Sequence, residues 1–423
     1  MVEHTSLIGQ FSQLTPKKIL VAGDLMLDTY TVGKAQRISP EAPVVVVRVE
    51  NEHALPGGAG NALLNLKALG AEPWILGKIG RDDAGKTLKK LLSDGGISTE
   101  TILDSAQSKT PVKNRIVSDN QQIVRIDHET ITPLSDEEER SLIAQIPKLL
   151  DQVDLVTISD YAKGFLTPNI LQALIRESNQ RKLFTIADPK GIDFSKYNGV
   201  TLLKPNQSEA YAAAKASPST PIDEVAKTLL QNYQIEYLMI TRSKDGIALF
   251  DRKGNRQDFT VKAKQVKDVT GAGDTVLATL AFCVANNLPL STAIQFANMA
   301  AGIAIEQFGC AQVSLIDLAK RLFDLDSRNK VFDLEHLPAL QFALKDTACF
   351  IHSFSGSSLP SPELISQLIE RKKTSDQPVL AVIESTPIHP EIVTALSALH
   401  PIDYVLLNTS LAHCKKAFAS SES

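Results

Sequence analysis

Cysteine is scarce in this sequence, and neither sign of charge dominates. The 423 residues include four cysteines, which are far apart and form no C-x-x-C pair, so a disulfide framework or a zinc site is not expected. The 44 basic and 48 acidic residues give a net charge of −4, which offers no electrostatic case for nucleic acid or an anionic membrane. No apolar run approaches the ~20 residues of a membrane span, and the N-terminus shows no basic-then-apolar signal. These absences predict a soluble cytoplasmic protein.

One stretch, residues 268–275 (D-V-T-G-A-G-D-T), organises the rest of the chain. It lies between a strand-like run at 259–266 and an apolar run at 276–284 that predicts a helix. Two glycines just before a helix allow a tight turn and leave N–H groups unpaired, which makes an anion site. A carboxylate would be repelled as a phosphate ligand, so Asp274 is predicted to be a general base. The alternative is a plain helix N-terminus with Asp274 as a first-turn acid.

The rest of the chain alternates strand-like and helix-like segments. Lys18–Gly23 has the apolar composition of a buried strand, and further strands are expected at 155–159, 183–187, 200–203 and 237–241. Strands that alternate with helices predict a mainly parallel sheet. The length predicts roughly two domains, and a change in character after a charged linker at 324–335 predicts a small second α/β domain at 336–423.

Two segments near the amino end carry candidate sugar ligands. Asp28 follows the first buried strand, at the strand end where open α/β sheets bind ligands. Gly57 and Gly58 precede a helix and would let backbone approach a ligand closely, while Asn61 can both donate and accept hydrogen bonds. The alternatives are a turn cap for Asp28 and an ordinary glycine-rich turn for the second segment.

Residues 206–209 (N-Q-S-E) follow another predicted strand. Asn206 could bind a phosphate, and Glu209 could hold magnesium through water. The same spacing also fits a capping box, in which Asn206 caps a helix that has an acid at its third position.

Residues 80–87 (G-R-D-D-A-G-K-T) match the spelling of a phosphate-binding P-loop. Asp82 and Asp83 would place two carboxylates inside the phosphate cradle. We therefore predict that this segment is not a P-loop and that Lys86 is an ordinary residue of an amphipathic helix.

Basic residues alternate with apolar ones between residues 97 and 127, a pattern typical of half-exposed strands. A solvated face is the simplest explanation, although Arg115 and Arg125 could meet a sugar phosphate. Residues 29–50 contain a proline-flanked valine run, Val44–Val47. We expect these residues to form strands that protrude from the main sheet as a lid or an interface, the alternative being a buried internal strand.

Taken together, the early G-G-x-x-N at 57–61 and the late D-x-T-G-A-G-D at 268–274 resemble the ribokinase-like (PfkB) family of sugar kinases. Further segments resemble the kinase half of the bifunctional heptose enzymes, which phosphorylate D-glycero-β-D-manno-heptose 7-phosphate at O1 and then adenylylate the product for lipopolysaccharide synthesis. These segments are 23–28, 37–43, 120–122, 159–164 and 188–191. The resemblance covers roughly residues 17–322.

The resemblance implies an open, mainly parallel sheet flanked by helices with a protruding β lid at about 29–50, within a kinase domain at 17–323 that follows an extension at 1–16. It implies ATP and Mg²⁺ as cofactors and a homodimer paired through the lid strands. Asp274 would be the base, and Gly271, Ala272 and Gly273 the anion hole. The nucleotide would be bound by Asn206, Gln207, Ser208, Glu209, Thr241 and Gly246. The sugar and its phosphate would be bound by Asp28, Gly57, Gly58, Asn61, Arg115, Arg125, Lys163 and Lys190.

The carboxyl-terminal domain resembles a degenerate, truncated nucleotidyltransferase. Such enzymes need a G-x-F-D…H-x-G-H stretch, and the corresponding region here, 354–360, is F-S-G-S-S-L-P, without a histidine pair. We therefore expect kinase activity without adenylyl transfer. The other hypotheses are a different sugar or nucleoside kinase of the same fold, or a non-catalytic protein that senses sugars or nucleotides.

Overall fold

The computed structural model describes residues 2–119, 121–261, 266–307, 309–325, 330–384 and 387–418. Residue contacts divide the chain into a larger unit, Thr15–Ser314, and a smaller unit made of Met1–Leu14 and Leu315–Ser423. None of the helices in the described part of the chain combines the length and the apolar character that crossing a bilayer requires.

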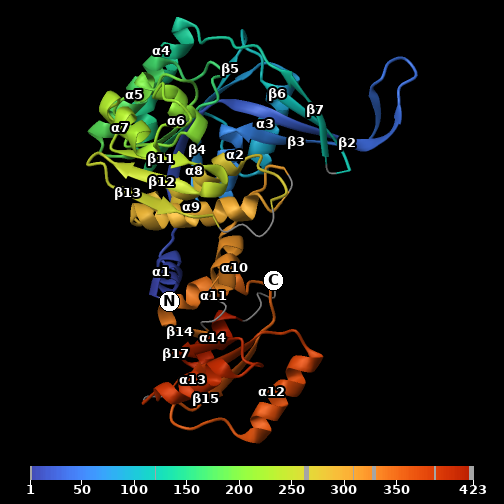
Figure 1. The fold of residues 1–423 in the computed structure, drawn as a ribbon, viewed down its shortest axis with the longest axis vertical. Coiled ribbons are helices and arrows are strands. Elements are labelled where there is room, and N and C mark those ends of the chain that lie inside the picture. Colours follow the sequence, from blue (N-terminus) through green and yellow to red (C-terminus); the bar gives the residue numbers. More distant parts are fainter. Residues whose placement is uncertain are drawn as a thin grey trace. The chain divides into compact units, whose positions relative to one another are not determined.

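A mainly parallel sheet forms the centre of the larger unit (Figure 1). Within the described residues it has nine strands in the order β13-β12-β11-β10-β9-β8-β1-β4-β5, and the pairs β11–β12 and β12–β13 are antiparallel while the others are parallel. The predicted α/β fold with a mainly parallel sheet is therefore confirmed. The strands are β1 (Lys18–Gly23), β4 (Glu72–Gly80), β5 (Ile102–Ser105), β8 (Leu155–Ser159), β9 (Phe184–Asp188), β10 (Leu202–Leu203), β11 (Tyr237–Thr241), β12 (Ile247–Asp251) and β13 (Arg256–Phe259).

Helices cover both faces of this sheet. One group is α2 (Ala59–Ala68), α3 (Asp83–Asp94), α8 (Ala272–Ala285) and α9 (Leu290–Ala304), and the other is α4 (Asp136–Leu150), α5 (Pro168–Gln180), α6 (Gln207–Ala213) and α7 (Ile222–Asn232). The helices of the first group contact β1, β4, β8, β9 and β13. Those of the second group contact β9 or β11, except α4, which packs on α5.

Local sequence signals explain several helix starts. Helix α4 begins with a capping box in which Ser135 and Glu138 bond each other's backbone N–H, and α5 begins with Thr167 as cap and Pro168 at the first position. A capping side chain accepts hydrogen bonds from N–H groups that the first turn of a helix leaves without partners. A proline at the first position has no N–H group that would need a partner. The apolar faces of α4 and α5 then pack on the sheet in one large hydrophobic core.

A second sheet forms the lid, with the strand order β3-β2-β6-β7. Its strands are β2 (Leu25–Ile38), β3 (Val45–Gly58), β6 (Val112–Ser118) and β7 (Gln121–His128). The hairpin of β2 and β3 projects from the body of the larger unit (Figure 1). This hairpin is much longer than the valine run at 44–47 indicated. Strand β3 lies at the edge of the lid sheet, so the alternative of a buried internal strand is wrong.

The smaller unit contains a parallel sheet in the order β14-β17-β16-β15. Its strands are β14 (Val331–Phe332), β15 (Phe350–Phe354), β16 (Val379–Ile383) and β17 (Tyr404–Leu407). Its helices are α1 (Val2–Phe11), α10 (Leu315–Leu325), α11 (Leu337–Ala343), α12 (Pro362–Thr374), α13 (Pro390–Ala398) and α14 (Leu411–Ala417).

The boundaries of this unit differ from those predicted. The segment expected to be a polar extension, 1–16, contains helix α1, whose Leu7, Ile8 and Phe11 are buried. Helix α1 contacts α10 and α11, and the ring of Phe11 packs edge-on against Phe342. These apolar contacts explain why the amino-terminal segment and α10 belong with the carboxyl-terminal residues. Of the predicted linker, 324–335, residues 326–329 lie outside the described residues.

Candidate functional site

The predicted base, Asp274, lies in the first turn of helix α8 and is only 3% exposed. The helix is capped by Gly271, whose φ of 78° is in the left-handed region. A Cβ at Gly271 would lie 2.7 Å from the side-chain nitrogen of Asn61. Glycine is therefore required here both for the turn and for the close approach of helix α2. The first N–H groups of α8, at the predicted anion-hole residues Ala272 and Gly273, have no partners within the helix, although that of Ala272 donates to the Val269 carbonyl at 3.3 Å. The preceding run predicted at 259–266 is strand only up to Phe259, and residues 262–265 lie outside the described residues.

Two side chains donate hydrogen bonds to the Asp274 carboxylate. Asn61 donates from Nδ2 to Oδ2 at 2.9 Å, and the Tyr161 hydroxyl donates to Oδ1 at 2.7 Å. Burial raises the pKa of Asp274 to about 6, while these two hydrogen bonds act in the opposite direction. Burial also raises the pKa of Tyr161 well above its ordinary value, so its phenol stays protonated and remains a donor. The carboxylate is thus ionised at neutral pH but is a stronger base than an exposed aspartate.

The loop that carries Tyr161 is fixed by a second buried carboxylate, Asp24. Asp24 directly follows β1 and accepts the backbone N–H groups of Tyr161, Lys163 and Phe165 at 2.9, 3.0 and 3.3 Å. Burial raises the pKa of Asp24, and the neighbouring Asp160 raises it further. Asp24 therefore positions the base indirectly, through the backbone of the loop after β8.

Asp28, the predicted sugar ligand, lies on β2 and is buried. Its Oδ1 accepts a hydrogen bond at 2.8 Å from Arg115 on β6. A Cβ at Gly57 would lie 2.4 Å from Asp28 Oδ2, which is why this part of β3 needs glycine. The guanidinium of Arg115 also lies 5.3 Å from the ring centre of Tyr30. The structure thus brings Asp28, Gly57 and Arg115 together at the base of the lid, with Gly58 capping helix α2.

A further ion pair lies beside the anion hole. Asp188 ends β9 and Lys204 follows β10, and because these strands are parallel neighbours, the two side chains pair at 2.7 Å. Lys204 is only 3% exposed. A Cβ on Gly273 would lie 4.0 Å from Asp188 Oδ2, so this pair borders the start of α8. The two charges also act on Asp274: Asp188 raises its pKa, and Lys204 lowers it.

The predicted nucleotide residues form one group. Asn206 caps α6 and forms a reciprocal capping box with Glu209, and Ser208 donates to Asn206 Oδ1 at 2.6 Å. Asn206 also pairs through its backbone with Thr241 at the end of β11. Gly246, with φ of 80°, completes the turn from Thr241, while Gln207 opens α6. The capping box that the sequence left as an alternative is therefore present, and it holds the nucleotide candidates side by side.

The four cations predicted to meet a sugar phosphate all have acidic partners. Arg115 pairs with Asp28, Arg125 with Asp127, Lys163 with Glu129 at 2.6 Å and Lys190 with Glu209 at 2.7 Å. Lys190 therefore lies with the nucleotide group rather than at the lid. Asn120, one of the residues that carried the resemblance, lies outside the described residues.

The P-loop-like segment 80–87 holds a carboxylate where a phosphate would have to sit. Asp82 caps α3 and accepts the backbone N–H groups of Gly85 and Thr110, both at 2.8 Å. Lys86 is exposed and pairs with Asp83 at 2.9 Å. This geometry supports the rejection of a P-loop.

Sequence reasoning missed four residues of the site: Tyr161, Asp24, Asp188 and Lys204. Each ends a parallel strand, directly follows one or lies in the loop after one. That position was visible in the sequence, but their partners come from distant segments, so the pattern alone could not assign them to the base, the loop or the anion hole.

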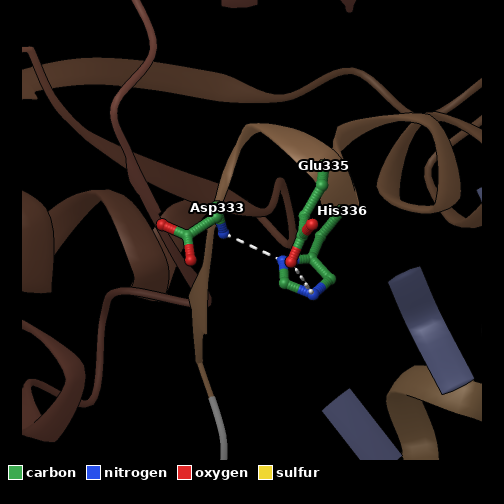
Figure 2. A group of neighbouring side chains, drawn as sticks. All are labelled: Asp333, Glu335 and His336. Atoms are coloured by element: carbon green, nitrogen blue, oxygen red, sulfur yellow. Dashed lines mark hydrogen bonds and ion pairs between the residues drawn. The ribbon is translucent and has the colours of Figure 1, made fainter. Parts of the chain in front are cut away.

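Among the described residues, one group in the smaller unit could offer three metal ligands: Asp333, Glu335 and His336 (Figure 2). One ring nitrogen of His336 is already engaged, because Nδ1 accepts the backbone N–H of Asp333 at 3.0 Å. Nε2 lies 3.7 Å from Glu335 Oε1, beyond hydrogen-bond distance. The Nδ1 bond stabilises the start of a short helix.

Comparison with known proteins agrees with this geometry. The pattern of the pfkB family of carbohydrate kinases matches residues 16–317. The chain is 41% identical over 331 residues to the bifunctional protein HldE of Trichlorobacter lovleyi (77% of this chain, 67% of that protein). It is 37% identical over 423 residues to HldE of Pelobacter propionicus (96% of this chain, 87% of that protein).

Solved structures show the same fold. Escherichia coli phosphofructokinase-2 in complex with potassium has a TM-score of 0.62 at 20% identity, covering 74% of this chain and 100% of that one. Arabidopsis thaliana ribokinase complexed with ribose and ATP has a TM-score of 0.57 at 17% identity, covering 73% of this chain and 99% of that one. The larger unit thus has the ribokinase-like fold, and the chain belongs to the pfkB family of carbohydrate kinases.

Proposed function

We propose that this sugar kinase transfers the γ-phosphoryl group of ATP to O1 of D-glycero-β-D-manno-heptose 7-phosphate, a step toward ADP-heptose for lipopolysaccharide. The observation that carries the proposal is the buried Asp274 carboxylate at the start of α8, held by Asn61 and Tyr161. The similarity to the HldE proteins, which extends over most of the chain, supports the heptose as acceptor.

In the proposed reaction Asp274 accepts the proton of the sugar hydroxyl as O1 attacks the γ-phosphorus. The bond from that phosphorus to the bridging oxygen breaks, and ADP leaves. The first N–H groups of α8, at Ala272 and Gly273, bind the oxygens of the phosphoryl group while it is being transferred. A pKa of about 6 suits this task, because the group is ionised at neutral pH and still basic enough to take a proton.

ATP would lie along the group formed by Asn206, Thr241 and Gly246, next to the Asp188–Lys204 pair. Members of this family use ATP, typically with a divalent metal, and we propose Mg²⁺. The metal offsets phosphate charge in such transfers. Glu209 provides the carboxylate chemistry that Mg²⁺ prefers. Its oxygens already accept from Lys190 and the Asn206 N–H, so a contact through water fits better than a direct bond.

The test is the substrate profile of the purified chain. ADP formation is measured with heptose 7-phosphate and with a panel of other sugars, sugar phosphates and nucleosides. The proposal expects the highest kcat/KM for heptose 7-phosphate. A higher value for another acceptor would keep the kinase and replace the sugar, and no ADP above background with any acceptor would favour the sensing alternative.

We further propose that the smaller unit does not transfer adenylyl groups. Adenylyl transfer builds negative charge on the α-phosphate and the departing pyrophosphate, which a histidine pair would offset. The histidines from residue 336 onward are His336, His352, His389, His400 and His413, and they form no His-x-x-His pair. Given ATP and heptose 1-phosphate, the chain should release no pyrophosphate above background. Steady formation of ADP-heptose would overturn this proposal.

The lid is the proposed dimer interface. Strand β3 is the edge of its sheet, and exposed edge strands invite pairing with another chain. Exposed apolar side chains gather near the hairpin end, including Ile38, Val44, Val45 and Val49. Sedimentation should show a homodimer that Val45→Glu dissociates. A wild-type chain that stays monomeric at every concentration would refute it.

A further inference from the structure

A lysine on the lid, Lys113, stands apart from the basic residues around it. It lies on β6, half-buried, with its ammonium 5.6 Å from the ring centre of Tyr161. The hydroxyl of the same ring donates to Asp274. A single tyrosine ring therefore separates this ammonium from the proposed base.

The acids nearest to Lys113 in the sheet are already paired with other cations. In the strand register Lys113 lies opposite Asp28 of β2 and Asp127 of β7. Asp28 Oδ1 accepts from Arg115, and both oxygens of Asp127 accept from Arg125. Nearby Lys163 is paired with Glu129.

Among the residues that the structure describes, no acidic side chain lies within ion-pair distance of Lys113. Its surroundings on balance disfavour its charge: burial lowers the pKa of Lys113 and the neighbouring Lys163 lowers it further, while Asp28 and Asp127 raise it by smaller amounts. A half-buried ammonium without an acidic partner is costly in the free protein. The contact with the Tyr161 ring compensates only weakly. An anion that binds beside Lys113 would remove this cost.

We infer that Lys113 is the residue that selects a phosphorylated sugar over its neutral counterpart, by binding the phosphate at the end of the sugar remote from the attacking hydroxyl. This inference rests on the proposed sugar kinase function. It differs from the sequence-based expectation, which assigned that phosphate to Arg115, Arg125, Lys163 and Lys190. Those four already have acidic partners, so a phosphate gains less from each of them.

The test compares Lys113→Met with the wild type on matched pairs of acceptors. The pairs are heptose with heptose 7-phosphate and fructose with fructose 6-phosphate. The wild type should prefer the phosphorylated member of the pair it uses. Lys113→Met keeps the apolar stem and removes the charge, so it should raise KM for the phosphosugar about 30-fold, as expected for the loss of a charge-assisted hydrogen bond. Its KM for ATP should stay within 2-fold.

Two further variants separate binding from structure. Lys113→Arg keeps the charge and should recover most of the preference. Lys109→Met removes an exposed lysine four residues earlier and should leave both KM values unchanged. If Lys113→Met keeps the wild-type preference, or raises the KM of ATP as much as that of the phosphosugar, the inference is overturned.

A binding measurement distinguishes this inference from the proposed function. Calorimetric titration of heptose 7-phosphate and heptose into wild type and Lys113→Met reports the preference without turnover. A wild type that binds the phosphosugar more tightly than the sugar, with the difference lost in Lys113→Met, supports the inference even if the chain proves inactive. Equal affinity of the wild type for the two ligands refutes it even if the chain proves an active kinase.

Discussion

The two parallel sheets of this protein differ most at the carboxyl ends of their strands. In the larger unit these ends carry hydrogen-bonded charges: Asp24 after β1 and Lys204 after β10 are buried, and Asp188 at the end of β9 is half-buried. In the smaller unit the corresponding positions, Ser355, Glu384 and Asn408, are exposed. Both units place polar residues where open sheets bind ligands, but of these strand-end residues, the buried charged side chains are those of the larger unit.

The difference matters because burial is what changes the chemistry of a carboxylate. Burial raises the pKa of Asp274 to about 6, which suits its proposed role as a base, and charges interact more strongly in a buried environment than in water. The smaller sheet is also parallel, but the polar residues at its strand ends lack that burial. Four variants test this comparison.

Asp274→Asn should have the largest effect. Asparagine cannot accept the proton of the sugar hydroxyl, so turnover should fall at least ~10²-fold. ATP binding, measured by calorimetry, should be retained because the nucleotide group lies on α6 and β11. Near-normal turnover of this variant at saturating sugar would show that Asp274 is not the base.

Tyr161→Phe should have the second largest effect, about 10-fold on kcat/KM, through loss of a hydrogen bond to a charged group. The base must be ionised to act, so the activity of the wild type should decline as pH falls through about 6. The Tyr161 hydrogen bond lowers the pKa of Asp274. Its removal should therefore move the acid limb of the pH profile to higher pH. An unshifted limb would mean that Tyr161 does not tune the base.

Lys86→Ala should lower turnover less than ~10-fold, because Lys86 is exposed and pairs with Asp83 rather than facing a phosphate. A lysine of a working P-loop neutralises phosphate charge directly, and its loss would cost far more. Steady-state kinetics on the folded variant decides the matter. A loss comparable to that of Asp274→Asn would restore the P-loop hypothesis.

Glu384→Gln should have the smallest effect and serves as the matched control for Asp274→Asn. Glu384 follows β16 of the smaller unit, is exposed, and accepts the backbone N–H of Leu411. Sugar phosphorylation by this variant should stay within 2-fold of the wild type. A large loss would show that the smaller unit takes part in the kinase reaction.

The sequence was sufficient to predict the mainly parallel sheet and to single out Asp274 at the start of a helix. The alternation of strands and helices and the D-x-T-G-A-G-D spacing are local patterns, and local patterns determine where elements begin and which residues share a helix start. Asn61 was also singled out, and its amide donates to Asp274 in the structure.

What the sequence could not predict depends on partners far away in the chain. Tyr161 and Asp274 are 113 residues apart, and nothing in either segment indicates that they meet. Nothing in the sequence around Lys163 indicated that its ammonium pairs with Glu129, as it does in the structure. Helix α1 was missed because Leu7, Ile8 and Phe11 are spaced along a short, otherwise polar segment, and their apolar partners come from the other end of the chain.

The three backbone hydrogen bonds that Asp24 accepts have a consequence for the thermodynamics of binding. They order residues 161–165 when the protein folds, so the conformational entropy of that loop is lost before any sugar arrives. A ligand that meets Tyr161 and Lys163 does not have to order their backbone. The entropic cost of ordering residues on sugar binding should then arise mainly in the lid hairpin of β2 and β3, and variants in that hairpin should change the entropy of sugar binding more than variants in the loop.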